Sequence, residues 1–216
     1  MEFFFGKQYV FSQWHPCTFI IDGKRYNCAE QYYMEQKAKT FGDRIKAEMV
    51  MKEEDPRKQK MLGRCVNGYS NSVWWEKCHD VVYEGNFAKF SQNAFLREKL
   101  FATRGKLLVE ASPYDSVWGI GLNIHDIRIT NKNLWMGGNW LGYVLTKVRE
   151  DLLKLYGKTP SYAITWDWAT LRRDPRIHTT FQQRKQSQDH LHQRKRSRDH
   201  QPADDLDQPS AKRAIK

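Results

Sequence analysis

The sequence lacks long apolar runs and the cysteine patterns of disulfide-rich or zinc-binding proteins. No stretch approaches about 18 consecutive apolar residues, the length of a membrane span. The four cysteines contain no Cys-x-x-Cys pair and the seven histidines form no cluster with them, so we expect free thiols and no metal. The chain also starts without the basic flank of a signal peptide. These absences predict a cytoplasmic or nuclear protein with no membrane partner.

Large apolar residues are scarce at the end of the chain. All eight Trp of the 216 residues lie between Trp14 and Trp168, and only five large apolar side chains follow Leu171. So few apolar residues cannot offset the conformational entropy lost when a segment becomes ordered. We therefore predict one folded domain over residues 1–160, followed by a linker and a disordered basic tail over residues 161–216.

Positive charge is concentrated in that tail. The chain carries a formal net charge of +11, and its last 45 residues hold 12 Lys and Arg against six Asp. The octapeptide Gln183–His190 recurs in similar form as Gln193–His200. Basic clusters of this kind are typical of import signals and of nucleic-acid contacts. A basic tail can equally serve solubility alone, so both interpretations stay open.

Hydrophobic spacing within the domain predicts many helices and a few short strands. An Asp22-Gly23 turn joins two of the strands, which are predicted over residues 7–11, 17–21, 24–26 and 106–110. Helices are predicted over residues 27–40, 56–67, 72–87, 92–103 and 139–155. Asn27 and Glu30 have the spacing of a capping box, which places Glu30 in the first turn of its helix. The fold class is therefore α+β, a single mainly helical domain with a few short strands.

The segment Asp115–Gly121 carries the strongest chemical signal. A carboxylate stands three residues before Trp118, and Gly119 and Gly121 let a ligand approach the backbone closely. An acid beside an aromatic ring is typical of sugar or base recognition, although Trp118 can equally fill the core. Glu30 has a similar pair of interpretations, catalysis or stabilisation of a helix start. Neither carboxylate defines a site by itself.

Together these features resemble the NADAR family, also called YbiA-like, over residues 3 to about 153. The resemblance is one of motif order and spacing, and it is carried by the segments Phe11–Trp14, Ala29–Ala38, Lys89–Asn93, Leu108–Gly121 and Gly138–Arg149. The chain departs from the family pattern at Gln13, Gln31 and Val82, where Asn, His and Met are usual. The loop over residues 123–137 resembles the larger form of the family.

The resemblance implies hydrolysis of the bond between the anomeric carbon of a ribose and a nitrogen. The implied substrates are guanine-linked ADP-ribose, free or on nucleic acid, and the phosphoribosylamino-pyrimidines of the riboflavin pathway. The resemblance implies Glu30 and Asp115 as the catalytic pair, with no cofactor and no metal. The residues that it implies for substrate binding are Trp74, Trp118, Lys89, Gln13, Gly119 and Asn139.

Two further assignments follow from this resemblance. Trp74 lies fifteen residues before Lys89, as the functional Trp of the family does. Trp74 is therefore predicted to face the ligand and its neighbour Trp75 to fill the core, because adjacent helical residues point in different directions. Lys89 and Arg149 are candidates to bind phosphate or to contact Asp115.

Carboxylates suit this reaction because an N-glycosidic bond breaks through an oxocarbenium-like state, whose positive charge a carboxylate stabilises. A different class of function is a non-catalytic module that binds ADP-ribose or another nucleotide. Such a module would keep the aromatic and basic residues but would need neither carboxylate. A third class is nucleic-acid binding through the tail alone, with strong salt dependence. The presence of both Glu30 and Asp115 favours the enzyme.

Overall fold

The computed structural model describes residues 1–176, and the predictions for the tail beyond them lie outside the described residues. The elements in chain order are β1 (Glu2–Phe4), β2 (Phe19–Ile21), β3 (Lys24–Tyr26), α1 (Ala29–Thr40), α2 (Arg44–Lys52), α3 (Pro56–Arg64), α4 (Asn71–Gln92), α5 (Ala94–Phe101), β4 (Leu108–Glu110), η1 (Ile127–Thr130), η2 (Lys132–Leu134), α6 (Trp140–Leu155) and α7 (Trp168–Arg172). This composition confirms the predicted α+β class. Across the described residues, no helix combines the length with the apolar surface that a bilayer crossing requires.

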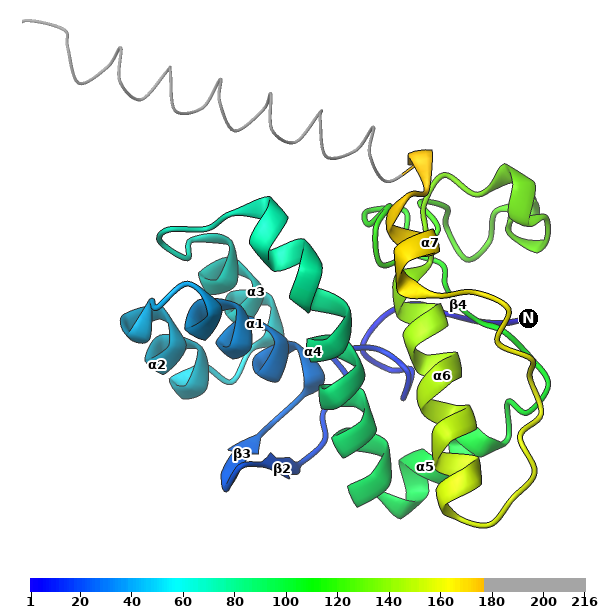
Figure 1. Ribbon diagram of the computed structural model, residues 1–216, viewed down its shortest axis with the longest axis horizontal. Helices are drawn as coiled ribbons and strands as arrows, with labels where there is room; N and C mark the ends of the chain where they lie inside the picture. Colours follow the sequence, from blue (N-terminus) through cyan, green and yellow to red (C-terminus); the bar gives the residue numbers. More distant parts are fainter. Residues whose placement is uncertain (177–216) are drawn as a thin grey trace, which may run out of the picture. The chain divides into compact units, whose positions relative to one another are not determined.

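The short strands of this part of the chain form two separate two-stranded sheets (Figure 1). β2 and β3 form the predicted antiparallel hairpin, with Phe19 opposite Tyr26. Its turn residues Asp22 and Gly23 both have positive φ, at 47° and 74°, as the tightest hairpin turns require. The strand predicted over residues 7–11 is wrong, because this segment forms turns. The strand lies closer to the N-terminus instead, in β1, which pairs in parallel with the distant β4.

The start of α1 differs from the predicted capping box. The helix begins at Ala29, Cys28 is its N-cap, and no side chain caps it. The Asn27 amide turns away and donates to the Glu54 carbonyl (3.1 Å). Glu30 keeps its predicted place in the first turn, but its carboxylate does not close a capping box.

α2 is an additional helix, and α4 is longer than predicted. The sequence analysis does not predict α2, which Asp43 caps by accepting the Lys46 N–H. Only two residues of α2 are buried, so its apolar stripe is too short to stand out as a helical pattern. α4 continues unbroken to Gln92, past the end predicted at residue 87.

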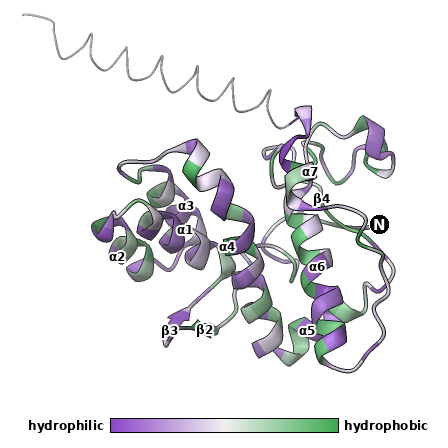
Figure 2. Cartoon of the chain, in the orientation of Figure 1, coloured by the Kyte–Doolittle hydropathy of each residue, from purple (hydrophilic) through white to green (hydrophobic). Residues whose placement is uncertain are grey.

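α4 occupies the centre of the fold, with α1 packed on it from one side and α6 from the other (Figure 1). α6 lies within the helix predicted over residues 139–155 and carries an apolar stripe, although Leu155 at its end is exposed. Hydrophobic residues recur along its ribbon between hydrophilic ones (Figure 2). The buried residues of this stripe, each at most 1% exposed, are Leu141, Val144, Leu145, Val148 and Leu152. They pack with buried residues of β1, α4, α5 and β4 in one cluster. Each such side chain contributes about 1.5–3 kcal/mol through burial.

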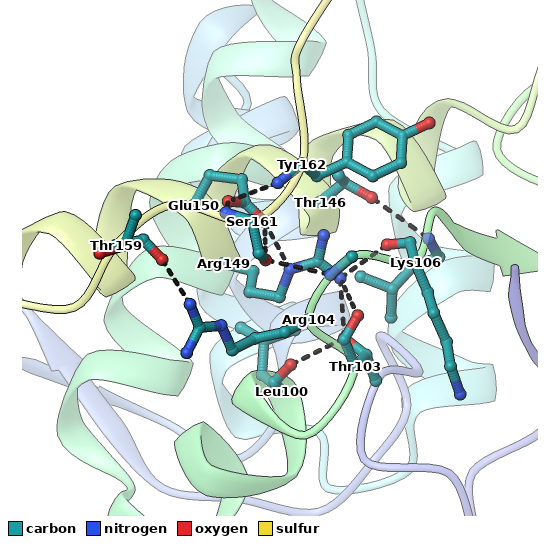
Figure 3. Close-up of polar contacts among 12 residues, drawn as sticks. Leu100, Thr103, Arg104, Lys106, Thr146, Arg149, Glu150, Thr159, Ser161 and Tyr162 are labelled. Atoms are coloured by element: carbon teal, nitrogen blue, oxygen red, sulfur yellow. Dashed lines mark hydrogen bonds and ion pairs between the residues drawn. The ribbon is translucent and has the colours of Figure 1, made fainter.

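A buried ion pair on α6 binds the segment that follows this helix (Figure 3). Arg149 Nε lies 2.7 Å from Glu150 Oε1, and both side chains are almost fully buried. Arg149 also donates to the Thr103 carbonyl (2.7 Å), while Glu150 accepts the Ser161 N–H (2.6 Å). Among the described residues, Arg149 therefore donates to Glu150 and to Thr103 and not to Asp115. The resemblance had suggested a contact between Arg149 and Asp115.

Ordered packing continues beyond residue 160, the predicted end of the domain. Trp168 in α7 stacks on the ring of the buried His79, with centroids 4.8 Å apart. Arg172 forms an ion pair with Glu76 of α4 (2.7 Å). α7 therefore packs on α4, although it lies in the segment predicted as linker.

Asn139 stands at the N-cap position of α6 but does not cap the helix. Its φ is 54°, in the left-handed region, and its side chain reaches β4. The Asn139 amide donates to the Leu108 carbonyl and its Oδ1 accepts the Glu110 N–H, both at 3.0 Å. Gly142 permits this approach, because a Cβ there would lie 2.1 Å from the Leu108 oxygen. Asn139 thus fixes the end of β4 against the start of α6.

Asn139→Ala is expected to lower the free energy of unfolding by about 2–4 kcal/mol, because two buried backbone groups lose their partner at about 1–3 kcal/mol each. Urea denaturation at neutral pH measures the loss. The control is Asn131→Ala, which removes the exposed cap of η2. If both substitutions cost less than about 1 kcal/mol, the Asn139 side chain does not hold β4.

Candidate active site

Glu30 carries a carboxylate that is buried and incompletely hydrogen-bonded. The residue is 4% exposed, and its N–H donates to the Gln13 carbonyl (3.0 Å), which ties α1 to the preceding loop. Within the described residues, Glu30 Oε1 has no hydrogen-bond partner. Burial raises the pKa of Glu30, against smaller opposing effects of Lys60 and the Trp14 indole. A buried acid in this condition is uncommon in a purely structural role and marks a candidate functional group.

Asp115 is fixed in the loop that follows β4. Its Oδ1 accepts the backbone N–H groups of Val117 and Trp118, both at 3.0 Å. Its Oδ2 lies 3.8 Å from Lys60 Nζ, and 19% of the Asp115 side chain is exposed, so a ligand can reach it. After burial, the Asp115 charge is one of the causes that raise the pKa of Glu30. The structure therefore brings the two predicted catalytic acids together.

Glu110 adds a third carboxylate, which the sequence analysis missed. It is the last residue of β4. Burial and then the charge of Asp115 raise the pKa of Glu110 to about 8, so it holds a proton at neutral pH. Gly119 allows the two acidic segments to approach, because a Cβ there would lie 2.9 Å from the Glu110 carbonyl oxygen and 2.8 Å from that of Asp115. Gly119 thus permits close backbone packing here, and its contact with a substrate stays a prediction.

Lys60 and Trp14 complete the polar part of the site and were also missed. Lys60 Nζ on α3 lies 3.8 Å from Asp115 Oδ2 and 5.9 Å from the centroid of the Trp14 ring. Its charge lowers the pKa of both buried glutamates, against the larger effect of their burial. A Lys on a polar helix usually faces solvent. In the sequence, only the four-residue spacing between Lys60 and Arg64 indicates that the two residues share a helix face.

An aromatic group lies beside the carboxylates and consists of Tyr33, Trp74 and Trp118. Tyr33 Oη accepts a hydrogen bond from Trp74 Nε1 (3.0 Å), and the Tyr33 ring meets Trp118 edge to face at 5.6 Å. Trp74 is 5% exposed. Trp75 instead packs on Trp140, with centroids 4.4 Å apart. Trp74 and Trp75 therefore point to different neighbours, and ligand contact by Trp74 stays a prediction.

Gln13 and Lys89 hold the loop that carries Trp14. The Asn86 amide donates to Gln13 Oε1 (2.9 Å), and Lys89 Nζ donates to the Ser12 carbonyl (2.8 Å). Lys89 is completely buried, and this burial lowers its pKa to about 8. These contacts tie the loop to α4 and give Lys89 a backbone partner, and contact of Gln13 or Lys89 with a substrate stays a prediction.

The site combines an acid that keeps its proton, two further carboxylates and a lysine. Such groups can exchange protons with a bound ligand and stabilise charge on it. Within residues 1–176, no group of three His, Cys, Asp or Glu side chains is placed to hold a metal ion. The site is therefore a candidate for acid–base chemistry by carboxylates on a small α+β domain.

Comparison with known proteins gives the family. The NADAR domain model matches residues 3–153. Protein irg-1 of Caenorhabditis elegans is 41% identical over 165 residues, which cover 69% of this chain and 78% of that protein. N-glycosidase R617 of Acanthamoeba polyphaga mimivirus is 42% identical over 148 residues, which cover 66% of this chain and 87% of that protein. The NMR structure of the Escherichia coli protein YbiA has a TM-score of 0.59 at 27% identity, covering 72% of this chain and 87% of that one.

The chain therefore belongs to the NADAR family, as the motifs predicted. The similarity to N-glycosidase R617 covers most of the length of that protein, and it confirms the predicted class of enzyme, an N-glycosidase.

Glu110→Gln is expected to raise the melting temperature more at about pH 8 than at about pH 5. The folded-state pKa of Glu110 is about 8, against about 4.3 in an unfolded chain. Its protonated form therefore contributes stability that is complete below about pH 4 and lost as the pH rises towards 8. Gln keeps the shape and cannot ionise. Melting curves of both proteins across this range measure the effect, and a pH-independent difference would contradict the raised pKa.

Proposed function

We propose that this chain hydrolyses the N-glycosidic bond between a ribose and a base or amine, at the cluster of Glu30, Glu110 and Asp115. The observation that carries the proposal is the convergence of these acids around Lys60, although they come from α1, β4 and the loop after β4. The buried Oε1 of Glu30, without a partner in the described structure, supports it as a group available to a substrate.

The proposed reaction needs a proton donor and a group that stabilises positive charge. Glu110, which holds a proton at neutral pH, is the candidate to protonate the leaving nitrogen as the carbon–nitrogen bond breaks. Asp115, fixed by two backbone N–H groups, is the candidate to stabilise the oxocarbenium-like sugar. A water molecule then adds its oxygen to the anomeric carbon, and Glu30 accepts its proton. The products are a free base and a ribose with a hydroxyl at the anomeric carbon.

The substrates that we propose are ADP-ribose attached to guanine, free or in nucleic acid, and phosphoribosylamino-pyrimidines. Both classes contain a ribose linked to nitrogen and a phosphate on that ribose. A non-catalytic nucleotide-binding module is the alternative function. The alternative explains the aromatic group but not the clustering of three acids, because burying carboxylates near an anionic ligand weakens binding.

For the basic tail, the amino-acid sequence is the basis of what we propose. Its charge clusters support contact with nucleic acid or with an import receptor. The first would bring the domain to ADP-ribosylated nucleic acid, and the second would place it in the nucleus rather than the cytoplasm. Neither contact is needed for hydrolysis of a small substrate.

Glu30→Gln and Asp115→Asn are each expected to lower kcat at least about a hundredfold, because removing a charge-stabilising group costs about 3 kcal/mol of barrier. The measurement is release of free base, followed by mass spectrometry, from ADP-ribosylated guanosine and from a phosphoribosylamino-pyrimidine. Glu48→Gln and Asp80→Asn are matched controls, since both residues are exposed. Full activity of the Glu30 and Asp115 variants would refute the assignment of these acids.

Trp118→Ala is expected to raise KM about five- to a hundredfold, because stacking a base on an aromatic ring is worth about 1–3 kcal/mol. Trp118→Phe should recover part of the affinity, since it keeps an aromatic face. Melting curves must accompany the kinetics because Trp118 also packs on Trp140. An unchanged KM in a folded Trp118→Ala protein would mean that Trp118 only fills the core.

A further inference from the structure

Two cations on neighbouring helices, Lys37 of α1 and Arg64 of α3, interact with the charge of Glu30 but form no salt bridge in the described part of the chain. Within residues 1–176 neither takes part in an ion pair, whereas Lys39, two residues further along α1, pairs with Glu35 at 2.9 Å. Lys37 is half-buried, and its Nζ lies 4.1 Å from the centroid of the Tyr69 ring. An aromatic face leaves the other side of an ammonium group available to an anion.

Helix packing brings these two cations beside each other. α3 meets α1 at Gly63, where a Cβ would lie 2.0 Å from the Met34 sulfur. Arg64 follows Gly63 directly, and Lys37 stands about one turn beyond Met34. Burial and then the charge of Arg64 lower the pKa of Lys37 to about 8. Two like charges this close repel each other, and an anion between them removes the repulsion.

Each cation lies on the same helix face as a residue of the active site. Lys37 lies seven residues after Glu30 on α1, which is two turns and about 10 Å along the same helix face. Arg64 follows Lys60 by about one turn of α3. The face between the two helices therefore runs from Glu30 and Lys60 in the active site to Lys37 and Arg64.

We propose that Lys37 and Arg64 form a phosphate subsite, which binds the phosphate on C5′ of the ribosyl substrate while the carboxylates act on its anomeric carbon. The identity of the sugar rests on the proposed function, whereas binding of the phosphate does not require turnover. The Arg64 guanidinium can donate two parallel N–H groups to phosphate oxygens, and Lys37 adds a point charge. The acids repel phosphate, so the substrate binds in one orientation.

Titration calorimetry tests this subsite with ribose 5-phosphate, ribose and inorganic phosphate as probes. We expect ribose 5-phosphate to bind more tightly than either of the other two. Lys37→Gln and Arg64→Gln should each weaken its binding about tenfold or more, because a charged hydrogen bond is worth about 1.5–3 kcal/mol. Binding of ribose should not change. The matched controls are Lys52→Gln on α2 and Lys58→Gln on α3, two exposed lysines, and both should bind as the unmodified protein does.

The outcomes separate this proposal from the proposed activity. Glu30→Gln should still bind ribose 5-phosphate, since it leaves both cations in place. The subsite is overturned if the Lys37 and Arg64 variants bind ribose 5-phosphate as tightly as the controls, or if the unmodified protein binds it no better than inorganic phosphate. Recovery of binding in Lys37→Arg and Arg64→Lys would show that charge, and not a change in folding, explains the loss.

Discussion

Mutual repulsion among buried carboxylates is the constraint on which the rest of this site depends. Carboxylates lose hydration when buried and raise one another's pKa when they share a site. Burial and the charge of Asp115 raise the pKa of both Glu30 and Glu110, while Lys60 acts against this on both glutamates and Arg64 acts against it on Glu30. With its pKa raised to about 8, Glu110 is the acid of this cluster that holds a proton at neutral pH. The titration therefore belongs to the cluster rather than to one side chain.

Holding the acids against this repulsion requires a stiff backbone around them. The supports are buried polar side chains that bind backbone groups: Asn139 holds the end of β4, and Lys89 holds the Ser12 carbonyl. Breaking such a contact leaves a buried polar group without a partner, which costs more than the net value of an ordinary hydrogen bond. Asn139 and Lys89 therefore support the backbone of the site, and their role in substrate binding stays a prediction.

Local signals in the sequence predicted the features that depend on local forces. α3 begins at residue 56 and α6 ends at residue 155, as their predicted ranges have it. β1 escaped prediction because its parallel partner β4 lies about a hundred residues away, and no local pattern records such a pairing. Glu30 and Asp115 followed from the family resemblance. Glu110 and Lys60 did not, because a Glu at a strand end and a Lys on a helix resemble ordinary surface residues until the fold buries them.

The contact between α1 and α3 sets the geometry of the whole face. Gly63 lets α3 approach Met34 closely, because a Cβ there would lie 2.0 Å from the Met34 sulfur, so a larger residue would shift either the Met34 side chain or the helix. A shift of α3 would move Lys60 away from the acids and Arg64 away from Lys37 together, because both residues project from α3. Interactions with a remote phosphate can lower the barrier only if they position the sugar correctly at the acids. A rigid contact between the helices couples the two ends, so the binding energy of the phosphate becomes available to the reaction at the anomeric carbon.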